Sequence, residues 1–457
     1  MVAQDENSFA VSFPLPFRVL FLVGLGILGW ATNLHGLERL GIDGPGILEL
    51  QGPNGLPIRS NNPPRTKRPT AASAYYAPIY QLFLTYSSWC FGAWLLYRTS
   101  TNSNAALVDD FSYIPGVCIL NVLTVLLCTL NVVQKRQRES FLLCFFTAAN
   151  SPIHFSDVIF ADIMTSYAKV LGDVWLSLWM LLPSGSMLSI PSHEGWLQWI
   201  LPSLMSLPYM IRLRQCLIEY RSPTNTSRRP LLNAIKYASS FPVIFLSAAQ
   251  RLVVSELVET HGEAARERAW HGEHPLFRLW LLAAVVNSLY SFWWDLTNDW
   301  GLEILQPRGV GPSSRSSKAF GRPSSYQEGL SGDESSSHPD GLLTPRTLST
   351  TSRSHVPLAY PYGLRPVLLY PLPVYPLIIF LNLVLRMTWS IKLSSHLHLH
   401  SEGSAVIFWL EVAEVFRRWM WVFLRIEWEL VRKGENDGFV RLDEPLRCKQ
   451  GEVRQMM

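Results

Sequence analysis

Long apolar runs recur along the chain, separated by polar loops, and most have about the 20 residues that a helix needs to cross a bilayer. A run at 141–149 is too short to cross, and the run at 153–182 is long enough but carries charges. The remaining candidates are residues 17–34, 75–97, 113–133, 196–211, 231–254, 275–296, 366–392 and 406–431. The pattern predicts an all-α, polytopic membrane protein with about eight to ten transmembrane helices.

The same pattern divides the chain into regions. A short tail (1–16) precedes the N-terminal transmembrane helices (17–149), and a core follows in two parts, 150–305 and 357–432. Between the two parts, residues 306–356 are rich in Ser and Pro and poor in large apolar residues, so we expect a disordered loop there. Residues 433–457 form a C-terminal tail.

Composition agrees with a lipid-facing surface. Hydrophobic residues make up 48% of the 457 residues and charged residues only 16%, against about 25% in soluble domains. A net charge of +4 leaves no basic arm for nucleic acid, so no nucleic-acid partner is expected. The six Cys include no CxxC pair, which argues against a zinc site or a disulfide framework.

Ionisable residues inside the expected helices are the most informative feature, because charge within a membrane is costly and marks a pathway or site by default. Five cations (Lys169, Lys236, Arg386, Arg417 and Arg418) accompany five acids (Asp162, Asp173, Asp295, Asp299 and Glu414). Asp162, Ser166, Lys169 and Asp173 are spaced to form one stripe of a single helix, Tyr237 adjoins Lys236, and Glu414 and Arg418 are spaced as an i,i+4 pair.

Two interpretations of this network stay open. The charges could neutralise one another as struts between helices, or they could line a water-filled path for an anion. A balanced set of charges suits an anion that must also leave.

Other chemistry is weakly indicated. His396, His398 and His400 alternate, but no ligand other than Glu402 is near them, so we expect an interfacial loop and no metal. We find no nucleophile with its base and no nucleotide-binding glycine motif, so neither an enzyme nor a cofactor is expected. The positive-inside rule favours a cytoplasmic location for 212–229, for the loop at 308–353 and for the cluster at 65–68, but these need not agree, so charge counting alone leaves the topology open.

Five motifs together resemble the EXS family, the membrane domain of eukaryotic phosphate exporters. They lie at 160–173, 212–221, 232–237, 294–302 and 414–427, in the family's order. The sixteen residues before the first expected helix leave no room for the SPX domain that other members carry there, so the chain is similar to the short branch of the family. That branch implies a Golgi membrane, export of the inorganic phosphate released by glycosylation, and a cytoplasmic C-terminus.

The resemblance also implies roles for single residues. The phosphate-lining positions correspond to Asp162, Lys236, Asp295, Arg386, Arg417 and Arg418, and Trp389 matches an aromatic gate. Ser166, Lys169, Asp173, Tyr237, Asp299 and Glu414 would support them. The chain departs from the family in its Ser-rich insertion and at Ala168, where exporters can carry a hydroxyl.

The expected function is therefore phosphate export to the cytosol, supporting glycosylation and the retention of ER luminal proteins and Golgi glycosyltransferases. The expected partners are inorganic phosphate and the bilayer. Golgi glycosyltransferases, coat-associated sorting factors and a second copy of the chain are partners that the sequence leaves open. Two rival functions are a non-transporting scaffold that retains glycosyltransferases and a transporter of another anion.

Overall fold

The structure is a computed structural model, and it describes residues 9–50, 73–129, 153–182, 185–188, 198–261, 275–302, 304, 364–365, 367–387 and 404–436. Within these ranges every regular element is helical and no strand occurs. The all-α membrane fold is thereby confirmed. Trp389, the loop at 306–356 and the three histidines lie outside the described residues.

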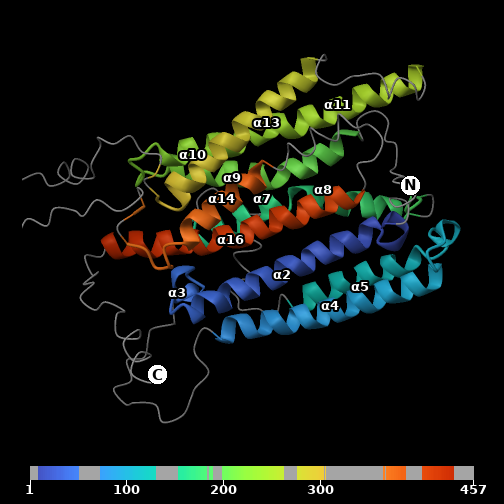
Figure 1. The fold of residues 1–457 in the computed structure, drawn as a ribbon, viewed down its shortest axis with the longest axis horizontal. Helices are drawn as coiled ribbons and strands as arrows, with labels where there is room; N and C mark the ends of the chain where they lie inside the picture. The colour runs from blue at the N-terminus through green and yellow to red at the C-terminus, as the bar shows by residue number, and fades with distance from the viewer. Residues whose placement is uncertain are drawn as a thin grey trace, which may run out of the picture.

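The N-terminal helices form one edge of the bundle (Figure 1). They are α2 (Leu15–Arg39), α3 (Gly44–Ile47), α4 (Ser73–Thr101) and α5 (Tyr113–Thr129), with a short 3₁₀ turn at Ala105–Leu107. Helix α2 packs against α4 and α5 on one side and against α8 and α16 on the other. Large apolar side chains of α4 and α5 such as Leu84, Phe91 and Leu120 remain exposed, as expected for a surface in contact with lipid.

The remaining helices form the rest of the bundle. They are α7 (Phe155–Ser166), α8 (Ala168–Met180), α9 (Ile200–Arg221), α10 (Arg229–Ala238), α11 (Ser240–His261), α13 (Pro275–Trp294), α14 (Val374–Arg386) and α16 (Ser404–Asn436). Helices α10, α11 and α13 lie at the edge opposite α4, with α7, α9, α14 and α16 between (Figure 1). Three described stretches are both long and apolar enough to cross a membrane: Leu15–Arg39, Arg229–Val253 and Pro275–Asp299.

Two of the expected membrane helices are broken, which corrects the prediction of a single polar stripe along 162–173. Tyr167 has φ −96° and ψ 9° and separates α7 from α8, and Ser239 separates α10 from α11. Breaks at membrane depth are tolerated where they line a cavity, because water or protein must satisfy the freed backbone groups. Both breaks lie next to the charged residues described below.

A third irregularity follows α13, where Asp295–Asp299 form a π-helical turn. The turn is closed by a hydrogen bond that the Trp300 amide donates to the Asp295 carbonyl at 2.9 Å. Gly301 follows with φ +62°, and a Cβ there would lie 2.4 Å from the Trp428 ring. Both the conformation and the close approach therefore require glycine, and the turn directs Asp295 and Asp299 into the protein interior.

Candidate functional site

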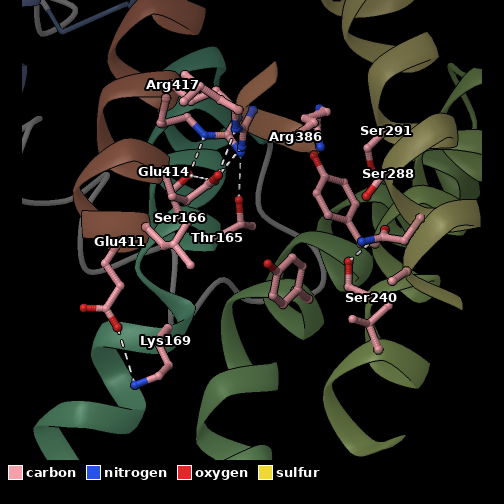
Figure 2. Close-up of a pocket in the computed structure, with 18 of the residues that line it drawn as sticks. Thr165, Ser166, Lys169, Ser240, Ser288, Ser291, Arg386, Glu411, Glu414 and Arg417 are labelled. Atoms are coloured by element: carbon pink, nitrogen blue, oxygen red, sulfur yellow. Dashed lines mark hydrogen bonds and ion pairs between the residues drawn. The ribbon is translucent and has the colours of Figure 1, made fainter. Parts of the chain in front are cut away.

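A cavity of about 300 Å³ lies among the broken helices, α9, α13, α14 and α16, at the lower end of the size range of small-molecule sites. We call it the central cavity. Five cations line it (Lys169, Lys236, Arg386, Arg417 and Arg418) with two carboxylates (Glu411 and Glu414). Hydroxyl groups complete the wall, as Figure 2 shows for Thr165, Ser166, Ser240, Ser288 and Ser291.

The two adjacent arginines of α16 differ in their partners. Arg417 donates to both oxygens of Glu414, from Nε at 2.9 Å and from Nη2 at 2.5 Å. Arg418 instead donates to Ser166 Oγ at 3.0 Å and Thr165 Oγ1 at 2.9 Å, and its Nη1 is buried without a hydrogen-bond partner among the described residues. The expected i,i+4 pair of Glu414 with Arg418 is therefore wrong, because Glu414 is occupied by Arg417.

The Asp295 carboxylate contacts cations of three helices, α10, α14 and α16, and lies behind the residues that line the central cavity. Its carboxylate, fully buried, accepts from Arg386 Nε at 3.0 Å and Nη2 at 2.5 Å and from Lys236 Nζ at 3.3 Å. Arg417 Nη1 lies 3.8 Å from it. Asp295 lines no described cavity. It therefore holds cations in position and does not itself face the solute path.

Asp162 pairs with an arginine that the sequence analysis assigned to a cytoplasmic segment. Arg212 Nε lies 2.8 Å from Asp162 Oδ1, and the Tyr237 hydroxyl donates to the same oxygen at 2.5 Å. Arg212 also donates to Gln215 at 2.6 Å. Arg212 is only 3% exposed, inside α9. Arg212 therefore does not belong among the loop charges that the positive-inside rule counts, because it is buried within a helix. The one available signal was the spacing of Arg212, Gln215 and Cys216 on one helix face.

One end of the central cavity carries a further charge cluster. Lys169 pairs with Asp173 one turn along α8 and lies 3.4 Å from Glu411 of α16. Arg18 of α2 is buried and interacts electrostatically with both acids. Figure 2 shows the Lys169–Glu411 contact apart from the arginine group at the other end of the cavity.

A second cavity, of about 540 Å³, lies beyond Asp162, toward the C-terminal end of α16. We call it the end cavity; its charged wall contains Asp162, Arg212, Arg229, Asp299, Arg425 and Glu429. At its edge, Glu49 contacts His154 at 3.0 Å and Lys433 at 3.1 Å. Burial alone would raise the pKa of the Glu49 carboxyl, but hydrogen bonds with His154 and Lys433 outweigh it and lower that pKa.

Asp162, Arg212 and Tyr237 connect the walls of the two cavities, and we call these three residues the partition. Tyr237 lines the central cavity, and Asp162 and Arg212 line the end cavity. The hydrogen bond between Tyr237 and Asp162 thus joins the two walls. A solute that passes from one cavity to the other must separate or rearrange these groups.

The structure brings most of the sequence-predicted residues together, in three groups. The central cavity is lined by Ser166, Lys169, Lys236, Tyr237, Arg386, Glu414, Arg417 and Arg418. Asp162 and Asp299 line the end cavity, and Asp173 and Asp295 line neither. No group of three or more possible metal ligands occurs in the described part of the chain. The expected gate, Trp389, lies outside it.

Comparison with known sequences gives matches along nearly the whole chain. "Protein ERD1 homolog 1" of Schizosaccharomyces pombe is 28% identical over 438 residues, covering 93% of each chain. "Protein ERD1" of Kluyveromyces lactis is 24% identical over 446 residues, covering 95% of this chain and 98% of its own. The human "Solute carrier family 53 member 1" is 25% identical over 297 residues, but these are 62% of this chain and only 33% of the human protein.

Relatives whose names include an SPX domain are longer. The match to "SPX and EXS domain-containing protein 5" of Dictyostelium discoideum, 27% identical, covers 44% of this chain and 22% of that protein. The similarity to the short branch is thereby confirmed. The model of the EXS family matches residues 13–431, a range that includes every residue lining the central cavity and all of the end cavity's lining except Arg432 and Lys433. The chain belongs to the EXS family.

Proposed function

We propose that this protein transports inorganic phosphate across the Golgi membrane, from the lumen to the cytosol. The observation that carries the proposal is Arg418, which forms no ion pair among the described residues and has a buried Nη1 without a partner at the wall of the central cavity. A buried guanidinium donor left unsatisfied is costly, and an anion in the cavity would satisfy it.

The cavity wall favours an oxyanion over a cation. Five cations face the space against Glu411 and Glu414, and hydroxyl groups next to them can donate to further oxygens. Guanidinium groups bind phosphate through several parallel hydrogen bonds and replace much of its hydration. The buried Asp295, behind the wall, balances part of the positive charge and would limit how tightly the anion is held.

Passage would follow the two cavities and open the partition between them. The break at Ser239 lies two residues from Tyr237, so a small rotation of α10 against α11 would move both Lys236 and Tyr237. Separation of Tyr237 from Asp162 would then connect the cavities. The Golgi location, the direction of transport and the link to glycosylation rest on the resemblance to the short branch of the family.

The direct test is flux of radiolabelled phosphate from proteoliposomes that contain the purified protein. We expect unlabelled phosphate to compete with the labelled flux, and sulfate and glucose 6-phosphate to inhibit it less. In Arg418→Ala the flux should fall by about tenfold or more. The matched control is Arg214→Gln, because Arg214 is exposed on α9 and lies in neither cavity. Absence of phosphate flux from the wild type, or stronger inhibition by sulfate, would refute phosphate as the substrate.

The predicted protein partners belong to the same proposal. Glycosyltransferases, sorting factors and a second copy of the chain would act on parts of the surface away from the two cavities. A scaffold of this kind does not need a buried cation that, among the described residues, forms no ion pair, so the central cavity favours transport over scaffolding.

A further inference from the structure

The end cavity differs from the central cavity in its location and in the cations that line it. Its wall contains Arg229 at the start of α10 and Arg425 and Arg432 in the last turns of α16. None of these three was among the residues predicted for the phosphate path. The family resemblance puts the C-terminal end of α16, and so this cavity, on the cytoplasmic side.

Arg229 has no carboxylate partner in the described part of the chain. Among the described residues its side chain donates one hydrogen bond, from Nη2 to the Asn298 carbonyl at 2.6 Å, which leaves its other nitrogens available there. Arg425 and Arg432 lie near enough to repel it electrostatically, and Asp299 and Glu219 attract it without forming an ion pair with it. A half-buried arginine beside two like charges is stabilised by an anion placed among them.

The acids of this wall are already engaged or exposed. Glu429 is shared by two arginines, at 3.2 Å from Arg425 and 2.7 Å from Arg432. Asp162 is paired with Arg212 and Asp299 with Lys236. Glu49 is paired with Lys433, and Glu219 is exposed. The wall holds five acids and five cations among the described residues, and Arg229 is the cation among them that pairs with no carboxylate there.

The guanidinium of Arg425 is also held in position. It lies over the Phe155 ring, 4.7 Å from the ring centroid, and pairs with Glu429 on its own helix. A pre-positioned guanidinium loses little freedom when an anion binds. Arg432, whose side chain is 42% exposed, stands at the mouth of the cavity, where an anion from solution would meet it first.

We propose that the end cavity is a second phosphate-binding site, with Arg229 and Arg425 as anion ligands and Arg432 at its entrance. This proposal rests on the proposed function, because phosphate would bind in the end cavity last, before its release to the cytosol. The two sites would lie on opposite sides of the partition. Phosphate could then leave the central cavity without full rehydration at each step, as conduction through several weak sites requires.

The test is phosphate-dependent thermal stabilisation of the full-length protein in phosphatidylcholine nanodiscs, in a wild-type and an Arg418→Gln background. We expect phosphate to stabilise both. Arg229→Gln should raise the half-saturating phosphate concentration in the Arg418→Gln background about tenfold, the effect of one lost charged hydrogen bond. Arg229→Lys should have a smaller effect. The control, Arg228→Gln, changes an exposed neighbour that lines neither cavity and should have none.

Arg432→Gln gives a second variant, since a side chain so exposed at a helix end can be changed without loss of the fold; it should weaken phosphate stabilisation severalfold.

The site is refuted if Arg229→Gln and Arg432→Gln leave phosphate stabilisation unchanged, or if Arg228→Gln weakens it equally. It is also refuted if nanodiscs with phosphatidic acid, and not free phosphate, give the Arg229-dependent stabilisation, since the ligand is then a lipid headgroup. Arg229-dependent binding without wild-type flux would refute the proposed function and leave the site standing.

Discussion

Asp295 Oδ2 accepts two hydrogen bonds from Arg386, from Nε at 3.0 Å and from Nη2 at 2.5 Å, while neither oxygen of Asp295 is exposed. One side of the arginine faces the central cavity and the other is held by the carboxylate. Because Asp295 also accepts from Lys236, the same carboxylate fixes two cations from different helices. Its role is to set the position and the net charge of the anion ligands.

Asp295→Asn tests this role. The amide keeps the shape but removes the charge that balances Lys236 and Arg386, so the variant should bind phosphate more tightly and release it more slowly. Uncompensated buried cations cost roughly 3–5 kcal/mol when one partner of a buried pair is lost, so the melting temperature should fall as well. Phosphate titration, flux and melting temperature in nanodiscs measure the three effects.

Asp110→Asn is the matched control, because Asp110 is exposed and lies in neither cavity. It should leave all three quantities unchanged. Weaker phosphate binding by Asp295→Asn would instead show that Asp295 contacts the solute.

Substitutions of Arg417 and Arg418, the adjacent arginines of α16, should impair the protein in different ways. Arg418→Ala removes the donor that faces the cavity, so phosphate flux should fall by about tenfold or more, the effect of losing one or more charged hydrogen bonds. The protein should remain folded, because the hydroxyls of Thr165 and Ser166 keep hydrogen bonds to Asp162 and Glu414 and no carboxylate among the described residues loses an ion pair; the contact of Arg418 with the Trp421 ring is lost. Arg417→Lys keeps the charge but cannot bond both oxygens of Glu414, so it should lower both flux and melting temperature.

The measurements are phosphate flux and thermal melting of the same preparations. Equal loss of melting temperature in Arg418→Ala and Arg417→Lys would contradict the division of roles. Unchanged flux in Arg418→Ala would exclude it from the path.

The sequence could predict the charged residues of this site that lie inside apolar runs. Charges inside apolar runs stand out because they are costly, and the family motifs fixed their order, so Lys236, Arg386, Arg417 and Arg418 were found and line one cavity. The fold class followed from the lengths of the apolar runs alone.

The sequence could not predict which cation pairs with which carboxylate. Pairing depends on the breaks at Tyr167 and Ser239. No proline or glycine adjoins Tyr167, whereas Pro242, which cannot donate a hydrogen bond to the Ala238 carbonyl, was an available signal for the break at Ser239. A continuous helix would have placed Asp162 and Lys169 on one face; the break assigns them to different cavities. Arg212 was overlooked because its segment is polar enough to resemble a loop, although its partner is buried in another helix.

Packing at the break itself gives a prediction on stability. The Tyr167 hydroxyl donates to the Leu22 carbonyl of α2 at 3.1 Å, and a Cβ at Gly26 would lie only 2.1 Å from that hydroxyl. Gly26→Ala should therefore lower stability by about 1–3 kcal/mol, the usual cost of overpacking, and lower the melting temperature. Tyr167→Phe removes the clashing oxygen and should partly rescue Gly26→Ala.

Gly92→Ala is the control for this pair, since no atom lies within 4 Å of a Cβ at Gly92 of α4. It should be neutral or slightly stabilising, because alanine favours a helix over glycine by roughly 0.5–1 kcal/mol. No rescue by Tyr167→Phe would show that the two helices do not meet at this contact.

The Arg386→Gln variant, expressed in cells, distinguishes the transport hypothesis from the scaffold hypothesis. This variant removes one cation from the central cavity but leaves Asp295 with Lys236 at 3.3 Å and Arg417 at 3.8 Å, so the protein should fold and reach its membrane at normal abundance. If the protein exports phosphate from the Golgi, free phosphate in the lumen should rise and glycosylation should fall. Luminal phosphate, glycosylation and protein level are measured in the same cells.

The scaffold hypothesis makes the opposite prediction for the same variant. A scaffold binds partners through surfaces outside the bilayer, whereas Arg386 contacts Asp295 in the interior and its side chain is only 12% exposed. A scaffold should therefore tolerate Arg386→Gln and should be more sensitive to Arg214→Gln, which changes an exposed charge. Normal luminal phosphate and normal glycosylation with well-expressed Arg386→Gln would refute transport through the central cavity, because one of the five cations that line it would be missing without effect.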